Sequence, residues 1–162
     1  MRRSILSLSL ALIFAAVPTL DAQTVWIQVG ATNPGEYAEP EAGVRVGTGG
    51  SQMLGFDASL DTYLRYLVIP AFVGVLDLSL RAQLRPVQPV TLVGRAGGTG
   101  LLLAAGGGAL LFTGYQGGVG VAVTADARTT VRLDYTYRRV RLDGRYQALP
   151  SVTFGFMVHH TG

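Results

Sequence analysis

The sequence predicts an all-β fold, an eight-stranded antiparallel up-and-down barrel. Segments of about ten residues alternate between apolar and polar side chains, which is the period of a strand whose two faces differ. Residues that favour turns separate these segments. The 22 glycines lie inside the apolar stretches as well as between them. This disfavours ordinary helices, because each interior glycine costs about 1 kcal/mol relative to alanine.

The N-terminus has the layout of a secretory signal peptide, since two arginines precede an apolar run and Ala22 closes a plausible cleavage site. An uncleaved membrane helix is the alternative, but Pro18 ends a run that is too short to span a bilayer comfortably. We therefore expect residues 1–22 to be removed on export and residues 23–162 to form one domain.

The first three strands are predicted at 24–32, 41–48 and 53–63. A polar loop, 33–41, separates the first two, and a glycine-rich turn, 47–51, follows the second. In each segment the apolar residues occupy every second position and so share one face of the strand, which we call its apolar parity; the other positions form its polar parity. The apolar residues are Val25, Ile27, Val29 and Ala31; Ala42, Val44 and Val46; and Leu54, Phe56, Ala58 and Leu60.

The fourth strand is predicted at 75–84, after a connection around 64–72, and the fifth at 90–100. Between them, the two prolines of 85–89 predict a turn, because proline cannot donate a hydrogen bond inside a paired strand. The apolar parity of the fourth strand is Leu76, Leu78, Leu80 and Ala82.

The last three strands are predicted at 110–124, 129–139 and 151–158, joined by a turn at 124–128 and a loop at 143–147. Their apolar parities are Val119, Val121 and Val123; Val131, Leu133, Tyr135 and Tyr137; and Val152, Phe154, Phe156 and Val158. Connections after the second, fourth and sixth strands are short, and those after the first, third and seventh are longer. We therefore expect both termini at the short-turn end of the barrel.

The polar parity carries five arginines and four aspartates: Arg45, Asp57, Asp61, Asp77, Arg81, Arg95, Arg132, Asp134 and Arg138. Only 14% of the residues are charged, against about 25% in a typical globular domain. A few nearly balanced charges among small residues favour a narrow, filled interior in which Arg and Asp pair.

The apolar parity would then face lipid, with aromatic residues near the strand ends at the two interfaces. We assign Trp26, Tyr63, Tyr115 and Tyr137 to these positions. The alternative is a soluble, secreted, lipocalin-like barrel with its apolar face inside, around an apolar ligand.

The stretch 96–125 fits the alternating pattern least well. It carries no charge, and its segment LLLAAGGGALLF (101–112) is apolar enough to suggest a membrane helix, although ten of the thirty residues are glycine. A pair of glycine-lined helices is therefore an alternative. In the barrel, this segment forms the ends of the fifth and sixth strands, and the pattern does not explain why their connection is so apolar.

The signal peptide, the eight segments, the short turns and the final TFGFMVHH resemble the small outer-membrane β-barrel proteins of Gram-negative-type bacteria, the OmpA-like and OmpX-like domains. In that family the last strand carries an assembly signal, which Thr153, Gly155, Val158 and His160 match loosely; the chain ends in Gly162 instead of the usual phenylalanine. The resemblance implies a transmembrane barrel in the outer membrane, surrounded by lipid and lipopolysaccharide and inserted by the barrel-assembly machinery.

Composition excludes several chemistries. Without cysteine or lysine there can be no thiol catalysis, zinc–cysteine site, Schiff base or Walker-type phosphate loop. The arginines are interleaved with aspartates, which disfavours a nucleic-acid surface. The only histidines, His159 and His160, are adjacent in a strand and would point to opposite faces, so they would not share one metal or substrate.

We therefore expect a non-enzymatic protein without a metal or cofactor, monomeric, acting as a membrane scaffold or a surface interaction protein. Asp57, Asp61 and Asp77 are interpreted as members of structural ion pairs and not as paired catalytic carboxylates. The second alternative is a lipid-acting outer-membrane hydrolase built on the same barrel.

Four arginines cluster where the seventh strand ends: Arg138, Arg139, Arg141 and Arg145. The last three would lie near the phosphates of lipopolysaccharide, and guanidinium groups suit bidentate phosphate contacts. The alternative is a solvated rim in which these arginines pair with acidic residues of the first loop, Glu36, Glu39 and Glu41.

Overall fold

The computed structural model describes residues 24–33, 37–48, 52–68, 71–126 and 129–158. The predicted signal segment at 1–22 and the pair His159 and His160 lie outside the described residues.

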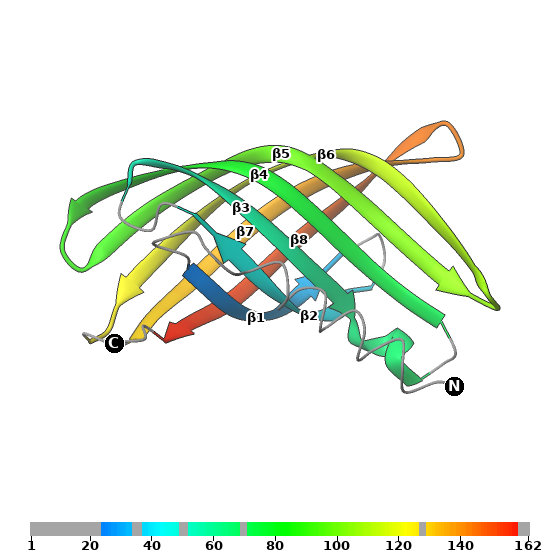
Figure 1. The fold of residues 1–162 in the computed structure, drawn as a ribbon, viewed down its shortest axis with the longest axis horizontal. Coiled ribbons are helices and arrows are strands. Elements are labelled where there is room, and N and C mark those ends of the chain that lie inside the picture. The colour runs from blue at the N-terminus through cyan, green and yellow to red at the C-terminus, as the bar shows by residue number, and fades with distance from the viewer. Residues whose placement is uncertain (1–23, 34–36, 49–51, 69–70, 127–128, 159–162) are drawn as a thin grey trace.

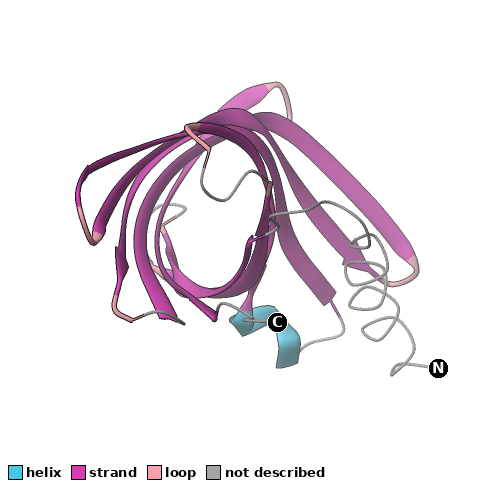
Figure 2. Cartoon of the chain, turned by 60° about the vertical axis from the view of Figure 1, so that its left-hand side comes forward, coloured by secondary structure: helices cyan, strands magenta, loops and turns pink. Residues whose placement is uncertain are grey.

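Eight antiparallel strands close into one barrel in which each strand pairs with its neighbours in chain order and β1 pairs with β8 (Figures 1 and 2). This confirms the predicted fold class. A short 3-10 helix, η1 (Leu64–Val68), lies between β3 and β4. The strands are β1 (Thr24–Thr32), β2 (Glu39–Gly47), β3 (Leu54–Tyr63), β4 (Ala71–Val87), β5 (Val90–Ala105), β6 (Gly108–Thr124), β7 (Thr129–Leu142) and β8 (Arg145–Val158).

The apolar parity of the strands forms the outside of the barrel. Ile27, Leu78, Leu133 and Phe154 are between 48% and 59% exposed, and they come from β1, β4, β7 and β8. The alternative with an apolar face inside the barrel is therefore wrong. A wide apolar exterior is unusual for a protein surrounded by water, and it is the normal exterior of a barrel surrounded by lipid.

The uncharged stretch 96–125 is formed by strands β5 and β6, so the alternative of a glycine-lined helix pair is also wrong. Among the described residues, no helix is both long and apolar enough to cross a membrane.

Strands β5 and β6 form one long hairpin that ends in a two-residue turn at Gly106 and Gly107, with φ angles of 60° and 89°. Such angles favour glycine, because side chains larger than hydrogen are strained there. β6 pairs with β7 only up to Gly114, so the hairpin projects beyond its β7 neighbour (Figure 1, lower right). The apolar segment 101–112 is thus paired strand on both sides of this turn, as the barrel interpretation expected, and the two strands extend beyond the predicted limits of 100 and 110.

The predicted loop at 143–147 is also shorter than expected. Asp143 and Gly144, with φ angles of 47° and 80°, form a two-residue turn, and β8 begins directly at Arg145 (Figure 1, upper right). Asp-Gly is a strong signal for such a hairpin turn, since both central residues need positive φ. The prediction of a longer connection after the seventh strand is therefore wrong.

The turn predicted at 85–89 is reduced to Gln88 and Pro89, because β4 continues to Val87. The β4–β5 register shifts between Leu84 and Val87, which places Pro86 in an irregular part of the ladder. Proline has no N–H to donate, and an irregularity accommodates it without breaking the strand.

We call the end of the barrel with the β5–β6 and β7–β8 turns the hairpin end, and the opposite end the terminal end. The described chain begins and finishes at the terminal end, at Thr24 and Val158. This arrangement agrees with the expectation that both termini lie at one end. The predicted contrast between short turns at that end and longer loops at the other is wrong, because the β5–β6 and β7–β8 turns at the hairpin end have only two residues each.

Candidate functional site

The nine charged residues predicted for the polar parity all lie inside the barrel, each at most 6% exposed. They come from five strands: Arg45 from β2, Asp57 and Asp61 from β3, Asp77 and Arg81 from β4, Arg95 from β5, and Arg132, Asp134 and Arg138 from β7.

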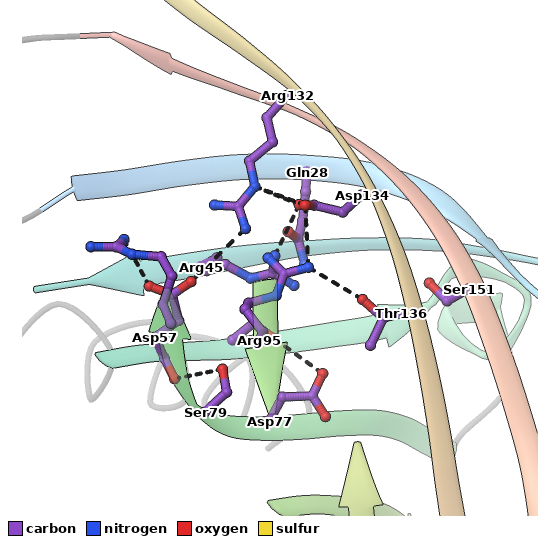
Figure 3. A network of polar contacts seen from close by, with 12 residues as sticks. Gln28, Arg45, Asp57, Asp77, Ser79, Arg95, Arg132, Asp134, Thr136 and Ser151 are labelled. Carbon is purple, nitrogen blue, oxygen red and sulfur yellow. Dashed lines mark hydrogen bonds and ion pairs between the residues drawn. The ribbon is translucent and has the colours of Figure 1, made fainter. Parts of the chain in front are cut away.

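Asp134 is the centre of the first group of contacts (Figure 3). Its carboxylate lies 3.0 Å from Nη1 of Arg45, 3.2 Å from Nη2 of Arg95 and 2.8 Å from Nε of Arg132. Gly120 on the neighbouring strand β6 makes room for the Asp134 side chain, since a Cβ atom at Gly120 would collide with this carboxylate. Three guanidinium groups around one carboxylate leave an excess of positive charge here.

Asp57 forms the second group and offsets part of that excess. It accepts a hydrogen bond of 2.9 Å from Nη1 of Arg81, and its other oxygen lies 3.9 Å from Nη2 of Arg132. Because Arg132 also contacts Asp134, the two groups form one continuous network.

Arg138 is the centre of the third group, which has the opposite charge balance. Its guanidinium lies 2.8 Å from both Asp61 and Asp77 and 3.8 Å from Glu41. Glu41 also accepts hydrogen bonds from the hydroxyls of Thr32 and Ser151. The three carboxylates together exceed the single arginine by two negative charges.

Glu41 is a charged interior residue that was not predicted, because it was assigned to the first loop. It shares the parity of Arg45 within one alternating segment, and that signal places it inside. With Glu41 added, the buried charged residues number five arginines and five carboxylates, so the described interior is formally neutral.

Trp26 and Tyr63 are also inside, each 6% exposed, so their assignment to the lipid interface is wrong. The guanidinium carbon of Arg132 lies 5.3 Å from the centre of the Trp26 ring, which suits a cation–π contact. Parity again identifies the correct face, because Trp26 has the same parity as the interior residue Gln28, and Tyr63 the same parity as Asp61. Tyr115 and Tyr137 do face outward, 49% and 41% exposed.

The buried aspartates each accept a charge-assisted hydrogen bond from an arginine, and Glu41 lies 3.8 Å from Arg138. The geometry suits mutual neutralisation across the lumen, which is the role expected for these residues. Among the described residues, no group of three or more His, Cys, Asp or Glu side chains is arranged to hold a metal ion.

Toward the hairpin end, the interior changes from charged to apolar. Tyr63, Val75, Leu101, Val140 and Leu149 form a buried cluster there. A pocket of about 640 Å³ lies beside this cluster, lined by residues of β2 to β8 and of η1. We call it the mouth pocket. This pocket was not predicted, since one of its walls comes from the segment 101–112, whose apolar character the sequence pattern does not explain.

Outside the barrel, near the hairpin end, Arg139 lies among tyrosines. Its guanidinium carbon is 5.5 Å from the centre of the Tyr146 ring, and the Tyr146 and Tyr115 rings are 5.7 Å apart. Arg141 is the next residue on the same outward parity and pairs in register with Tyr146. We call Tyr115, Arg139, Arg141 and Tyr146 the basic–aromatic cluster.

Two of the three alternative partners of these arginines are engaged elsewhere. Glu41 is inside the barrel with Arg138, and Glu39 accepts a hydrogen bond of 2.9 Å from Arg65 of η1. Glu36 lies outside the described residues. Arg145 is exposed at the β7–β8 turn, where it pairs in register with Leu142.

A closed eight-stranded barrel with an apolar exterior and charged side chains in its lumen defines the class of outer-membrane β-barrel folds. Among solved structures, the chain is similar to Neisserial surface protein A, with a TM-score of 0.64 and 14% identity over 85% of this chain and 97% of that one.

Two further structures show the same likeness. The N-terminal β-barrel domain of Pseudomonas aeruginosa OprF gives a TM-score of 0.57 at 13% identity, covering 83% of this chain and 96% of that domain. Ail, the attachment invasion locus protein of Yersinia pestis, gives 0.52 at 12% identity, covering 86% and 99%. At these identities the likeness shows the fold. No protein-family model and no curated protein matches the sequence.

Proposed function

We propose that this protein is an exported, monomeric outer-membrane barrel that acts as a scaffold or a surface interaction protein without enzymatic activity. The observation that supports it best is the contrast between its two faces, because the apolar residues are outside and ten charged residues are buried inside. Lipid is the solvent that stabilises this inverted arrangement. The buried side chains fill the middle of the lumen, so the role fits a scaffold better than an open pore.

The first prediction concerns location and assembly. After expression with its native N-terminus, the protein should be recovered in the outer-membrane fraction, shortened at Ala22. It should migrate faster on gels before boiling than after, because closed barrels resist unfolding by detergent. A full-length product found in the soluble fraction, with no shift in mobility, would refute the proposal.

The basic–aromatic cluster supports a specific lipid contact, in which Arg139 and Arg141 bind phosphate groups of lipopolysaccharide and Arg145 assists from the turn. Tyrosines are enriched at the membrane interface, so Tyr115 and Tyr146 place Arg139 at the level of the lipid headgroups. In addition, Nε of Arg139 is buried and has no hydrogen-bond partner among the described residues. A rotation of the side chain toward the headgroups would let this nitrogen donate to an anionic oxygen.

The second prediction tests this contact. Replacing Arg139 and Arg141 with glutamine should weaken lipopolysaccharide binding by about tenfold, since charge-assisted hydrogen bonds to phosphate are lost. Binding is measured with the purified barrel in nanodiscs, against intact and dephosphorylated lipopolysaccharide. The matched control is Arg65→Gln, because Arg65 is an exposed arginine that already pairs with Glu39. If the wild-type protein, the Arg139 and Arg141 variant and the Arg65 control bind lipopolysaccharide with equal affinity, the phosphate contact is refuted.

A further inference from the structure

The mouth pocket has the size and the lining of a small-molecule site. Its volume of about 640 Å³ falls within the range of about 300–1,000 Å³ found for ligand pockets. It is concave and is enclosed by residues from seven strands and η1. The charged network lies deeper in the lumen, so the pocket is separate from the ion pairs centred on Asp134, Asp57 and Arg138.

Its walls are apolar and partly aromatic. Leu101, Leu103 and Leu110 line the side formed by the β5–β6 hairpin. Tyr63 and Tyr66 line another side; their ring centres are 6.5 Å apart, and the angle between the ring planes is 58°. A ligand that removes apolar surface of this kind from water gains about 25 cal/mol of binding free energy per Å² buried.

The walls present no uncompensated charge to a ligand. The stretch 96–125, which supplies the hairpin wall, has no charged residue. The carboxylate lining the pocket is that of Glu39, and it is neutralised by Arg65 at 2.9 Å. This ion pair also ties η1 to β2 and thereby holds Tyr66 beside the pocket.

The projecting hairpin accounts for the shape of the site. Because β6 extends beyond its last pairing with β7 at Gly114, the hairpin wall of the pocket projects past β7, while β4 stays paired with β5 as far as Ala105. The β5–β6 and β7–β8 turns contain two residues each, so neither provides a long loop that would cover the opening. Neither of these two turns therefore covers the pocket.

From these observations we infer that the mouth pocket binds an uncharged small molecule made mainly of hydrocarbon or aromatic groups. The inference rests on the proposed function only for the direction of entry, because lipopolysaccharide bound at the basic–aromatic cluster would place the hairpin end outside the cell. Such a ligand accounts for the apolar character of 101–112, which a scaffold alone does not need.

The experiment uses the protein isolated from membranes and placed in phospholipid nanodiscs, with the neutral fluorophore N-phenyl-1-naphthylamine as the probe. Two cross-strand leucine pairs on the same hairpin provide matched variants. Leu103 and Leu110 line the pocket and pair with each other, whereas Leu102 and Leu111 pair with each other on the outward parity.

We expect saturable binding in excess of that to empty nanodiscs. Replacing Leu103 and Leu110 with glutamine should weaken it by about tenfold, because the polar amides disfavour an apolar ligand. The same change at Leu102 and Leu111 should alter it by less than about twofold. Equal binding in both variants, or no excess over empty nanodiscs, would overturn the inference.

Oligomeric state and barrel assembly are measured on the same samples. A shift in oligomeric state caused only by the Leu103 and Leu110 variant would show that a second copy covers the pocket, which also overturns the inference. Gel mobility before and after boiling reports barrel assembly independently of the probe. A protein that assembles in membranes but does not bind the probe therefore refutes the pocket and leaves the proposed function intact.

Discussion

Replacing Arg138 with methionine should lower the free energy of unfolding by about 3–5 kcal/mol, the usual cost of removing one partner from a buried ion pair. Arg138 is fully buried and is the arginine that contacts Glu41, Asp61 and Asp77. Without it, three carboxylates remain in the lumen with no cation in contact among the described residues. Methionine fills much of the same volume, so the loss reports mainly the missing charge.

The effect is measured by urea unfolding of the barrel in lipid vesicles, followed by the fluorescence of Trp26. Arg141→Met is the matched control, since Arg141 lies on the same strand but is exposed on the outer face. That change should cost less than about 1 kcal/mol. Combining Arg138→Met with Asp61→Asn and Asp77→Asn should recover part of the stability, because fewer unpaired charges remain. Equal stability of the Arg138 and Arg141 variants would contradict the proposed role of the network.

Parity in the sequence was sufficient to predict the interior of the barrel. Arg132 and Asp134 alternate with Leu133 and Tyr135, and the structure places the first two inside and the others outside. The errors arose where another criterion replaced parity. Trp26 was assigned to the interface by its residue type, although its parity is that of the interior residue Gln28.

Strand ends were harder to predict because the pattern changes there. In 101–112 both parities are apolar, since the outward side carries Leu102 and Leu111 while the inward side lines the mouth pocket. Alternation therefore disappears although the strands stay paired up to Ala105 and Gly108. The pocket could not be predicted for the same reason, because it depends on how far the hairpin projects beyond β7. That distance follows from the register, which the sequence pattern does not provide.

Replacing Leu133 with arginine should prevent stable membrane assembly, since an arginine at the bilayer midplane of a barrel costs about 2–4 kcal/mol. Leu133 is 56% exposed and pairs in register with Val121 and Phe154, so it lies within the apolar outer surface. The measurement is the yield of the fast-migrating form in isolated outer membranes. Thr136→Ser should leave that yield unchanged, because Thr136 faces the lumen and serine keeps its hydroxyl.

The decisive comparison is with Leu111→Arg. Leu111 is 61% exposed, similar to the 56% of Leu133, and it also faces outward, but it lies on the part of the β5–β6 hairpin that projects beyond β7. An arginine there would reach water or headgroups at little cost. If water surrounded the whole barrel, the two substitutions would be tolerated equally, since each places a charge on an exposed apolar position. Loss of assembly in Leu133→Arg alone would therefore show that lipid surrounds the middle of the barrel and not the tip of the hairpin.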